Sequence, residues 1–170
     1  MLGIRWIPSF LIVWILLLSL SGGTIVAGRA GIGNFEFSLN GYTLTGTLTN
    51  GTITHDGHVA MQMSVDQTIP ISDGSILVTA TGVWSGTTNF AIITGSIANV
   101  KGNIYACISG QCKNGNYTGS GSWVGTFKWN KTQGSVASGT FQGELNILNA
   151  PPAQSAPFPV TGNWTTTFST

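Results

Sequence analysis

The chain has 170 residues, of which only 6% are charged and 42% are hydrophobic, and it contains 24 glycines. Ordinary soluble domains carry about 25% charged residues. The formal net charge of +1 excludes the basic surface with which nucleic-acid-binding proteins neutralise phosphates, and the many apolar side chains exclude an intrinsically disordered chain. No residue pattern specifies a reaction. The sequence is therefore informative about the cellular compartment and the fold of the protein rather than about its activity.

Residues 1–30 have the layout of a secretory signal peptide. Arg5 precedes an uncharged apolar run over residues 6–20, and small residues follow it. An uncleaved membrane anchor is the alternative, because residues 6–27 carry no ionisable side chain and are long enough to span a bilayer. Pro8 weakens a continuous membrane helix, which favours cleavage. In both cases residues 31–170 are expected to be extracellular or at the cell surface.

Residues 31–170 alternate apolar and polar side chains, as β-strands do, and show no helical period. Asn40-Gly41, Asn50-Gly51 and Asp56-Gly57 have the composition of hairpin turns. Strands are predicted around these turns and then over residues 76–84, 90–98, 103–107, 122–129, 136–148 and 160–169. The fold class is therefore all-β, a single antiparallel β-sandwich or barrel of about 8–10 strands, and the alternation does not distinguish the two. The proline-rich segment 150–159 is predicted to be an extended connector.

Cys107 and Cys112 are the only cysteines, and a turn-forming tetrapeptide, Ile108-Ser109-Gly110-Gln111, separates them. Two positions that face each other across a tight hairpin can meet the geometry of a disulfide, and an exported protein encounters the oxidant that the bond requires. A metal site would need further ligands, and none lies nearby in the sequence. We predict a structural disulfide.

Four Asn-x-Thr sequons begin at Asn50, Asn116, Asn130 and Asn163. In an exported chain such sequons are predicted to be glycosylated and to lie in surface loops. The glycans would add solubility to a domain that has nine charged residues between positions 31 and 170.

Few side chains are suited to catalysis or to metal binding. His55, Asp56 and His58 surround one predicted turn and could hold a zinc or copper ion, but no third histidine or cysteine lies nearby, which favours a solvated hairpin tip. Glu36 and Glu144 lie on polar strand faces, where two solvated residues are favoured over a glycosidase-type carboxylate pair. We therefore predict a protein that is not an enzyme and that has no cofactor.

The tryptophans have two alternative interpretations: they are part of the hydrophobic core, or they form an exposed platform for a ligand. Trp123 and Trp129 share one face of a predicted strand, and an exposed pair could stack on a sugar ring. Burial of this face is favoured, because a domain of this size needs large side chains in its core. Trp84 and Trp164 are predicted to be partly exposed. All four are candidate ligand-stacking residues.

A signal peptide, an early alternating strand over residues 31–39 and a Thr-, Gly- and Asn-rich domain of low charge with several sequons together resemble the secreted subunits of archaeal thread-like, donor-strand filaments. The resemblance implies a secreted or cell-surface structural protein, a filament or surface-layer subunit, that assembles with itself or with other surface proteins. Segments 31–39 and 160–169 are the candidates for pairing with a neighbour's sheet edge. The alternative is a secreted carbohydrate- or ligand-binding module that uses exposed tryptophans.

Overall fold

The computed structural model describes residues 29–39, 41–130, 132, 134–148 and 156–169. Nearly all of the predicted signal peptide, residues 1–28, and most of the proline-rich connector lie outside the described residues. Within the described part of the chain, no helix is long and apolar enough to cross a membrane.

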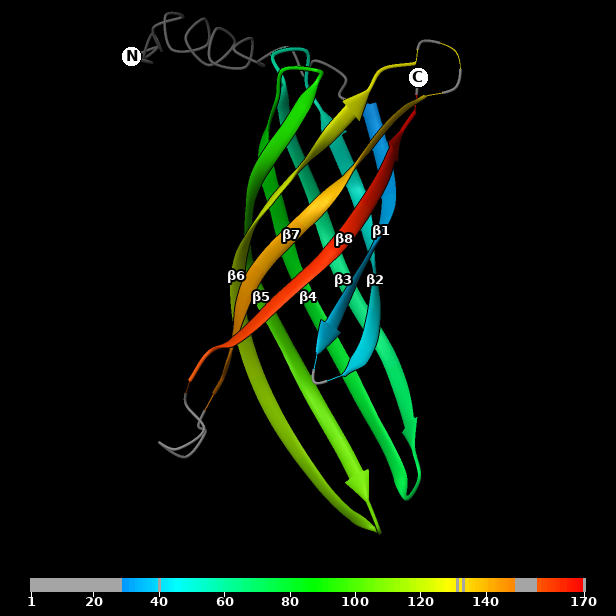
Figure 1. Ribbon diagram of the computed structural model, residues 1–170, viewed down its shortest axis with the longest axis vertical. Coiled ribbons are helices and arrows are strands. Elements are labelled where there is room, and N and C mark those ends of the chain that lie inside the picture. Colours follow the sequence, from blue (N-terminus) through cyan, green and yellow to red (C-terminus); the bar gives the residue numbers. More distant parts are fainter. Residues whose placement is uncertain (1–28, 40, 131, 133, 149–155, 170) are drawn as a thin grey trace, which may run out of the picture.

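Eight antiparallel strands form one closed barrel, in which each strand pairs with the next along the chain and the last pairs with the first (Figure 1). The strands are β1 (Arg29–Leu39), β2 (Tyr42–Ile53), β3 (His58–Ile71), β4 (Gly74–Thr88), β5 (Ile92–Ile108), β6 (Gln111–Lys128), β7 (Ser135–Ile147) and β8 (Phe158–Phe168). The predicted all-β class is confirmed. Of the two closures, the structure has the barrel and not the sandwich, because β1 and β8 pair over seven consecutive positions.

Two of the three predicted turns are hairpin turns, since Gly41 and Gly57 have the positive φ angles of 82° and 85° that such turns require. The prediction of a turn at Asn50-Gly51 is wrong. Asn50 lies inside β2 with a φ of 50°, and the β2–β3 register shifts between Thr49 and Thr52. Between these two positions β2 has one residue more than β3. The extra residue forms a β-bulge, which bends the strand without ending it.

Aromatic rings fill the middle of the barrel. Trp84, Trp123 and Trp164 are 0–2% exposed, and their ring centroids lie 5.3–6.0 Å apart. Phe35 and Phe141 pack against Trp84 at 5.9 and 5.4 Å. Each indole N–H donates a hydrogen bond, to Met63 Sδ, to the Ser96 carbonyl and to the Thr140 carbonyl respectively. Eight-stranded barrels have an interior just wide enough for side chains to fill, and here aromatic rings fill it.

Glycines on the inward face provide the space for these rings. A Cβ atom on Gly125 would lie 2.7 Å from Trp164 Cζ2 and would overlap the Ser138 carbonyl oxygen. A Cβ atom on Gly46 would overlap the ring of Phe35. Small residues thus make room for large ones on the neighbouring strand, as Gly46 does for Phe35, or two strands away, as Gly125 does for Trp164, and small and large residues also alternate in other small barrels.

The outward face carries hydroxyl and amide side chains. Thr43, Thr45, Thr47 and Thr49 are all exposed on β2. Neighbouring strands are linked on this face by side-chain hydrogen bonds, such as the one of 2.8 Å between Thr47 Oγ1 and Ser64 Oγ. Such groups hydrogen-bond to water without carrying charge, which explains how a domain with so few charged residues covers its core.

Four strands continue beyond the barrel at one end. The hairpins β3–β4 and β5–β6 project at the lower end of Figure 1, whereas β1 begins and β8 ends at the opposite end. Residues 66–79 and 103–116 form this four-stranded extension, which we call the flap, and its register is continuous with that of the barrel.

We expect Gly125→Ala to lower the free energy of unfolding by about 1–3 kcal/mol, because a methyl group added to a filled core forces side chains or backbone to shift. Gly115→Ala is the matched control, since a Cβ atom at Gly115 meets no atom within 4 Å, and its effect should stay within about 0.5 kcal/mol. Urea unfolding of both variants measures the difference. Equal destabilisation would show that the Trp164 contact does not limit the core.

Candidate functional site

The inner face of the flap is apolar and continues the core of the barrel. Ile69, Ile76 and Ile104 are half-buried and pack against the core cluster. Ile108, at the end of β5, is 46% exposed. Among the residues that the structure describes, only four of the eight strands reach this level, so no described strand lies opposite the apolar face.

Gln67 marks the place where the flap separates from the barrel. The backbone N–H of Thr45 donates to Gln67 Oε1 at 2.8 Å, and Gln67 Nε2 donates to the Thr43 carbonyl at 3.4 Å. The side-chain amide thus takes the place of the next backbone pair between β2 and β3, whose register reaches only to Ser64. Beyond Gln67, β3 is an edge strand among the described residues.

A cavity of about 230 Å³ lies at the opposite edge of the flap, where β7 ends. It is lined by Ile104, Ala106, Lys113, Asn114, Gly115, Asn116, Tyr117 and Ile147. A smaller cavity of about 50 Å³ shares Ile104, Tyr117 and Ile147 with it and also touches Leu39, Leu145 and Phe158. The two cavities form a mostly apolar recess at the open end of the barrel.

Tyr117 lies between this recess and the core. Its ring is 4% exposed, and its hydroxyl donates to the Thr79 carbonyl at 3.0 Å. Burial raises the pKa of Tyr117 to about 12, because the phenolate would be poorly solvated there.

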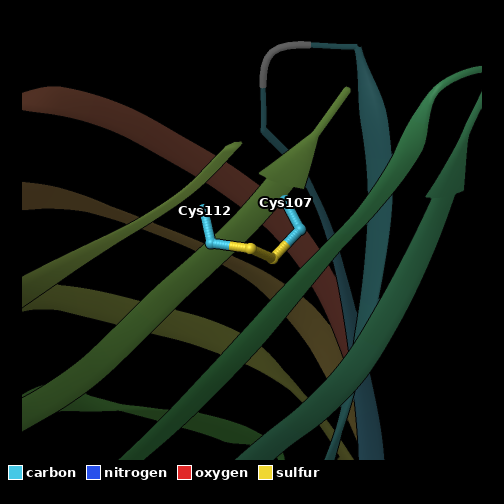
Figure 2. The surroundings of a disulfide bond; sticks show 2 residues. All are labelled: Cys107 and Cys112. Carbon is cyan, nitrogen blue, oxygen red and sulfur yellow. A yellow bond between two sulfur atoms is a disulfide. The ribbon is translucent and has the colours of Figure 1, made fainter. Parts of the chain in front are cut away.

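The predicted disulfide joins Cys107 and Cys112, with an S–S distance of 2.02 Å. The two residues face each other across the β5–β6 hairpin (Figure 2). The disulfide therefore fixes the tip of the flap, where the sheet has lost the support of the closed barrel. For so short a loop the stabilisation is about 2 kcal/mol.

Three of the four candidate ligand-stacking tryptophans belong to the core. Trp84, Trp123 and Trp164 lie on the inward register of their strands and are almost fully buried. Burial of the face that Trp123 and Trp129 share is confirmed for Trp123 and wrong for Trp129, and the predicted partial exposure of Trp84 and Trp164 is wrong. Trp129, just beyond β6, is 44% exposed, and the Arg29 guanidinium lies 3.9 Å from its ring centroid. Because Trp123 is buried, the alternative of a sugar platform formed by Trp123 and Trp129 on one strand face is not realised.

The asparagines of the four sequons are accessible to different degrees and do not all lie in loops. Asn50, Asn116 and Asn163 are exposed, but they lie within β2, β6 and β8, so the prediction of surface loops is wrong for these three. The hydroxyls and amides of this chain are frequent on the outward strand register, where sequons also fall. Asn130 lies in a turn and is half-buried, and its Oδ1 accepts hydrogen bonds from the N–H and the hydroxyl of Thr132.

The histidine cluster occupies the tip of the β2–β3 hairpin, where all three side chains are exposed. His58 Nε2 lies 3.4 Å from Asp56 Oδ2. A hydrogen bond from the Thr54 hydroxyl holds the pKa of Asp56 below its usual range, with a smaller contribution from His58. No group of three or more His, Cys, Asp or Glu side chains suited to a metal occurs within the described ranges.

Glu36 and Glu144 are exposed, as predicted, but they do not form a pair. Their partners on β8 are Asn163 and Pro159, four positions apart, which corresponds to about 13 Å along a strand. Glycosidase carboxylates lie no more than about 9.5 Å apart. Glu36 instead shares an outer groove of about 650 Å³ with Asp66 and Asn163, which the sequence pattern did not indicate.

Sequence reasoning also missed the recess at the flap. Its signal was weak, because Gly115 stands among asparagines and turn formers in the run Lys113-Asn114-Gly115-Asn116, which is equally typical of a loop. Only the strand register shows that Gly115 faces inward, opposite Ile104.

Comparison with known proteins gave no match: no family model, curated protein or solved structure matches this chain.

Tyr117 makes the stability depend on pH in the alkaline range. An unfolded tyrosine has a pKa of about 10, so between pH 10 and 12 the unfolded chain releases this proton before the folded chain does. The free energy of unfolding should therefore fall by about 2 kcal/mol more in the native protein than in Tyr117→Phe across this interval. Urea unfolding at pH 8, 10, 11 and 12 measures both slopes, and identical slopes would contradict the assignment.

Proposed function

We propose that the protein is an exported, non-enzymatic structural protein of the cell surface, which assembles with further copies of itself or with other surface proteins. The observation that carries the proposal is the flap, a disulfide-stapled sheet extension with two edges at which β3 and β6 lack a neighbouring strand among the described residues. Edges of this kind add strands from a partner.

Three features support export. The cross-strand disulfide requires an oxidising compartment, and residues 1–30 have the sequence layout of a signal peptide. The exposed sequon residues Asn50, Asn116 and Asn163 are accessible to glycosylation.

The edge of β6 is the more suitable of the two for assembly. The Leu148 N–H donates to the Asn116 carbonyl at 2.8 Å, so the backbone of Asn116 points away from β5, and that of Asn114 does the same because backbone direction alternates in antiparallel pairs. On β3, Pro70 removes one donor, which is a common protection of strand edges. Exchange of residues 31–39 or 160–169 is harder, since both β1 and β8 are paired on both sides.

Export can be tested on protein recovered from outside the producing cells. We expect an N-terminus after the apolar run 6–20, together with no free thiol, since both cysteines are in the disulfide. Cys107→Ser/Cys112→Ser is the control for the thiol assay. A full-length chain that keeps its N-terminus, remains inside the cell and has two reactive thiols would overturn the export proposal.

Assembly can be tested by blocking the edge of β6 while leaving the barrel intact. Asn114→Pro removes an outward N–H, which an edge strand tolerates, whereas Asn114→Ala loses the same side chain and keeps the N–H. We expect oligomers for the native protein and for Asn114→Ala, and monomers for Asn114→Pro, in sedimentation velocity and negative-stain images. A native protein that is monomeric at every concentration, or oligomers that persist in folded Asn114→Pro, would contradict assembly through this edge.

A further inference from the structure

We infer that the recess over Gly115 binds the alkyl chain of a small anionic amphiphile, such as a medium-chain carboxylate, with the anionic head group beside Lys113. The recess adjoins the edge of β6 that the proposed assembly uses, since Asn114 and Asn116 belong to both. The inference does not rest on the proposed function, because binding of an amphiphile is a property of the single chain and is measured without assembly.

Gly115 departs from the packing rule of the barrel. At every other glycine within the described strands, a Cβ atom would lie within 4 Å of a neighbouring atom, most often an aromatic side chain or the backbone of the next strand. At Gly115 it would meet no atom of the described residues within that distance. The space that a neighbouring side chain fills elsewhere is empty here, and it coincides with the cavity that Gly115 lines.

The recess has the size and polarity for an alkyl chain. Its walls are the side chains of Ile104, Ala106 and Ile147 and the ring of Tyr117, whose hydroxyl is turned to the Thr79 carbonyl. An apolar cavity of about 150 Å³ takes up benzene. The 230 Å³ of the main cavity therefore admits a chain of roughly eight carbons, and the smaller cavity extends the same path toward the core.

The residues at the rim of the recess determine which head group of a bound amphiphile is preferred. Lys113 is the one charged side chain in the lining of either cavity, and it is exposed on the inward register beside Ala106. The side chains of Asn114 and Asn116 lie on the outward register, where both amide oxygens accept hydrogen bonds from Asn103 Nδ2. The head group is therefore met by the Lys113 ammonium group, which favours a carboxylate over a cationic or neutral head group.

The test is calorimetric titration of the exported protein with hexanoate, octanoate and octanol. Each added methylene should strengthen binding roughly fourfold, so octanoate should bind about fifteenfold more tightly than hexanoate, and octanol more weakly than octanoate. Binding that does not depend on chain length, or that does not saturate for octanoate, would overturn the inference.

Variants separate the two parts of the recess. Gly115→Leu fills the cavity and should abolish octanoate binding, and Ala106→Leu, which narrows it from β5, is a second blocking variant should the first fail to fold. Lys113→Gln should reduce octanoate affinity to the level of octanol. Lys101→Gln, at an exposed lysine on the outward face of β5, is the matched control and should bind as the native protein does. Unchanged octanoate affinity in a folded blocking variant would contradict binding in the recess.

Discussion

The packing of aromatic rings against inward glycines is the constraint on which the rest of the structure depends. Trp84, Trp123 and Trp164 need more room than eight strands with ordinary side chains leave, and glycines such as Gly125 provide it. The three tryptophans are in turn the largest fully buried side chains of the core, and each is worth several kcal/mol. Ring and glycine must therefore lie at the same level of the barrel, one strand apart for Gly46 and Phe35 and two strands apart for Gly125 and Trp164, and this requirement constrains the register of the barrel.

A filled interior determines where binding can occur. With the lumen occupied by rings, contacts with other molecules are restricted to the outer wall and to the ends of the barrel. The outer wall carries many hydroxyl and amide groups, scattered apolar side chains such as Ile32 and Val124, and few charges, so it offers hydrogen bonds without strong electrostatic attraction. The flap is different, because there the inward face continues while the opposing strands have ended. Apolar surface, strand edges and an unfilled cavity all coincide at that end.

The sequence predicted the strands better than the way in which they close into a barrel. Alternation identified the strands, and Cys107 and Cys112 were paired correctly because a tight hairpin places such residues opposite each other. Burial of Trp84 and Trp164 was missed, since alternation tells which residues share a face but not which face is inside. Asn50 has the residue type and the positive φ of a turn. Only the pairing of β2 with β3 distinguishes a bulge from a turn at this position. Gly115 was missed for the same reason, because its space depends on where β7 ends.

The position of the disulfide follows from the same geometry. In the barrel each strand has two neighbours, and its inward side chains meet others across the lumen; in the flap, β3 and β6 have one neighbour each, and the inward face has no opposing wall. Per residue, the flap gains less from packing and would open first. The disulfide stabilises the hairpin without burying further surface. The apolar face and the edge of β6 therefore stay accessible. The disulfide therefore stabilises the part of the molecule that gains least from packing, which is also the part where the proposed assembly edge and the proposed ligand recess lie.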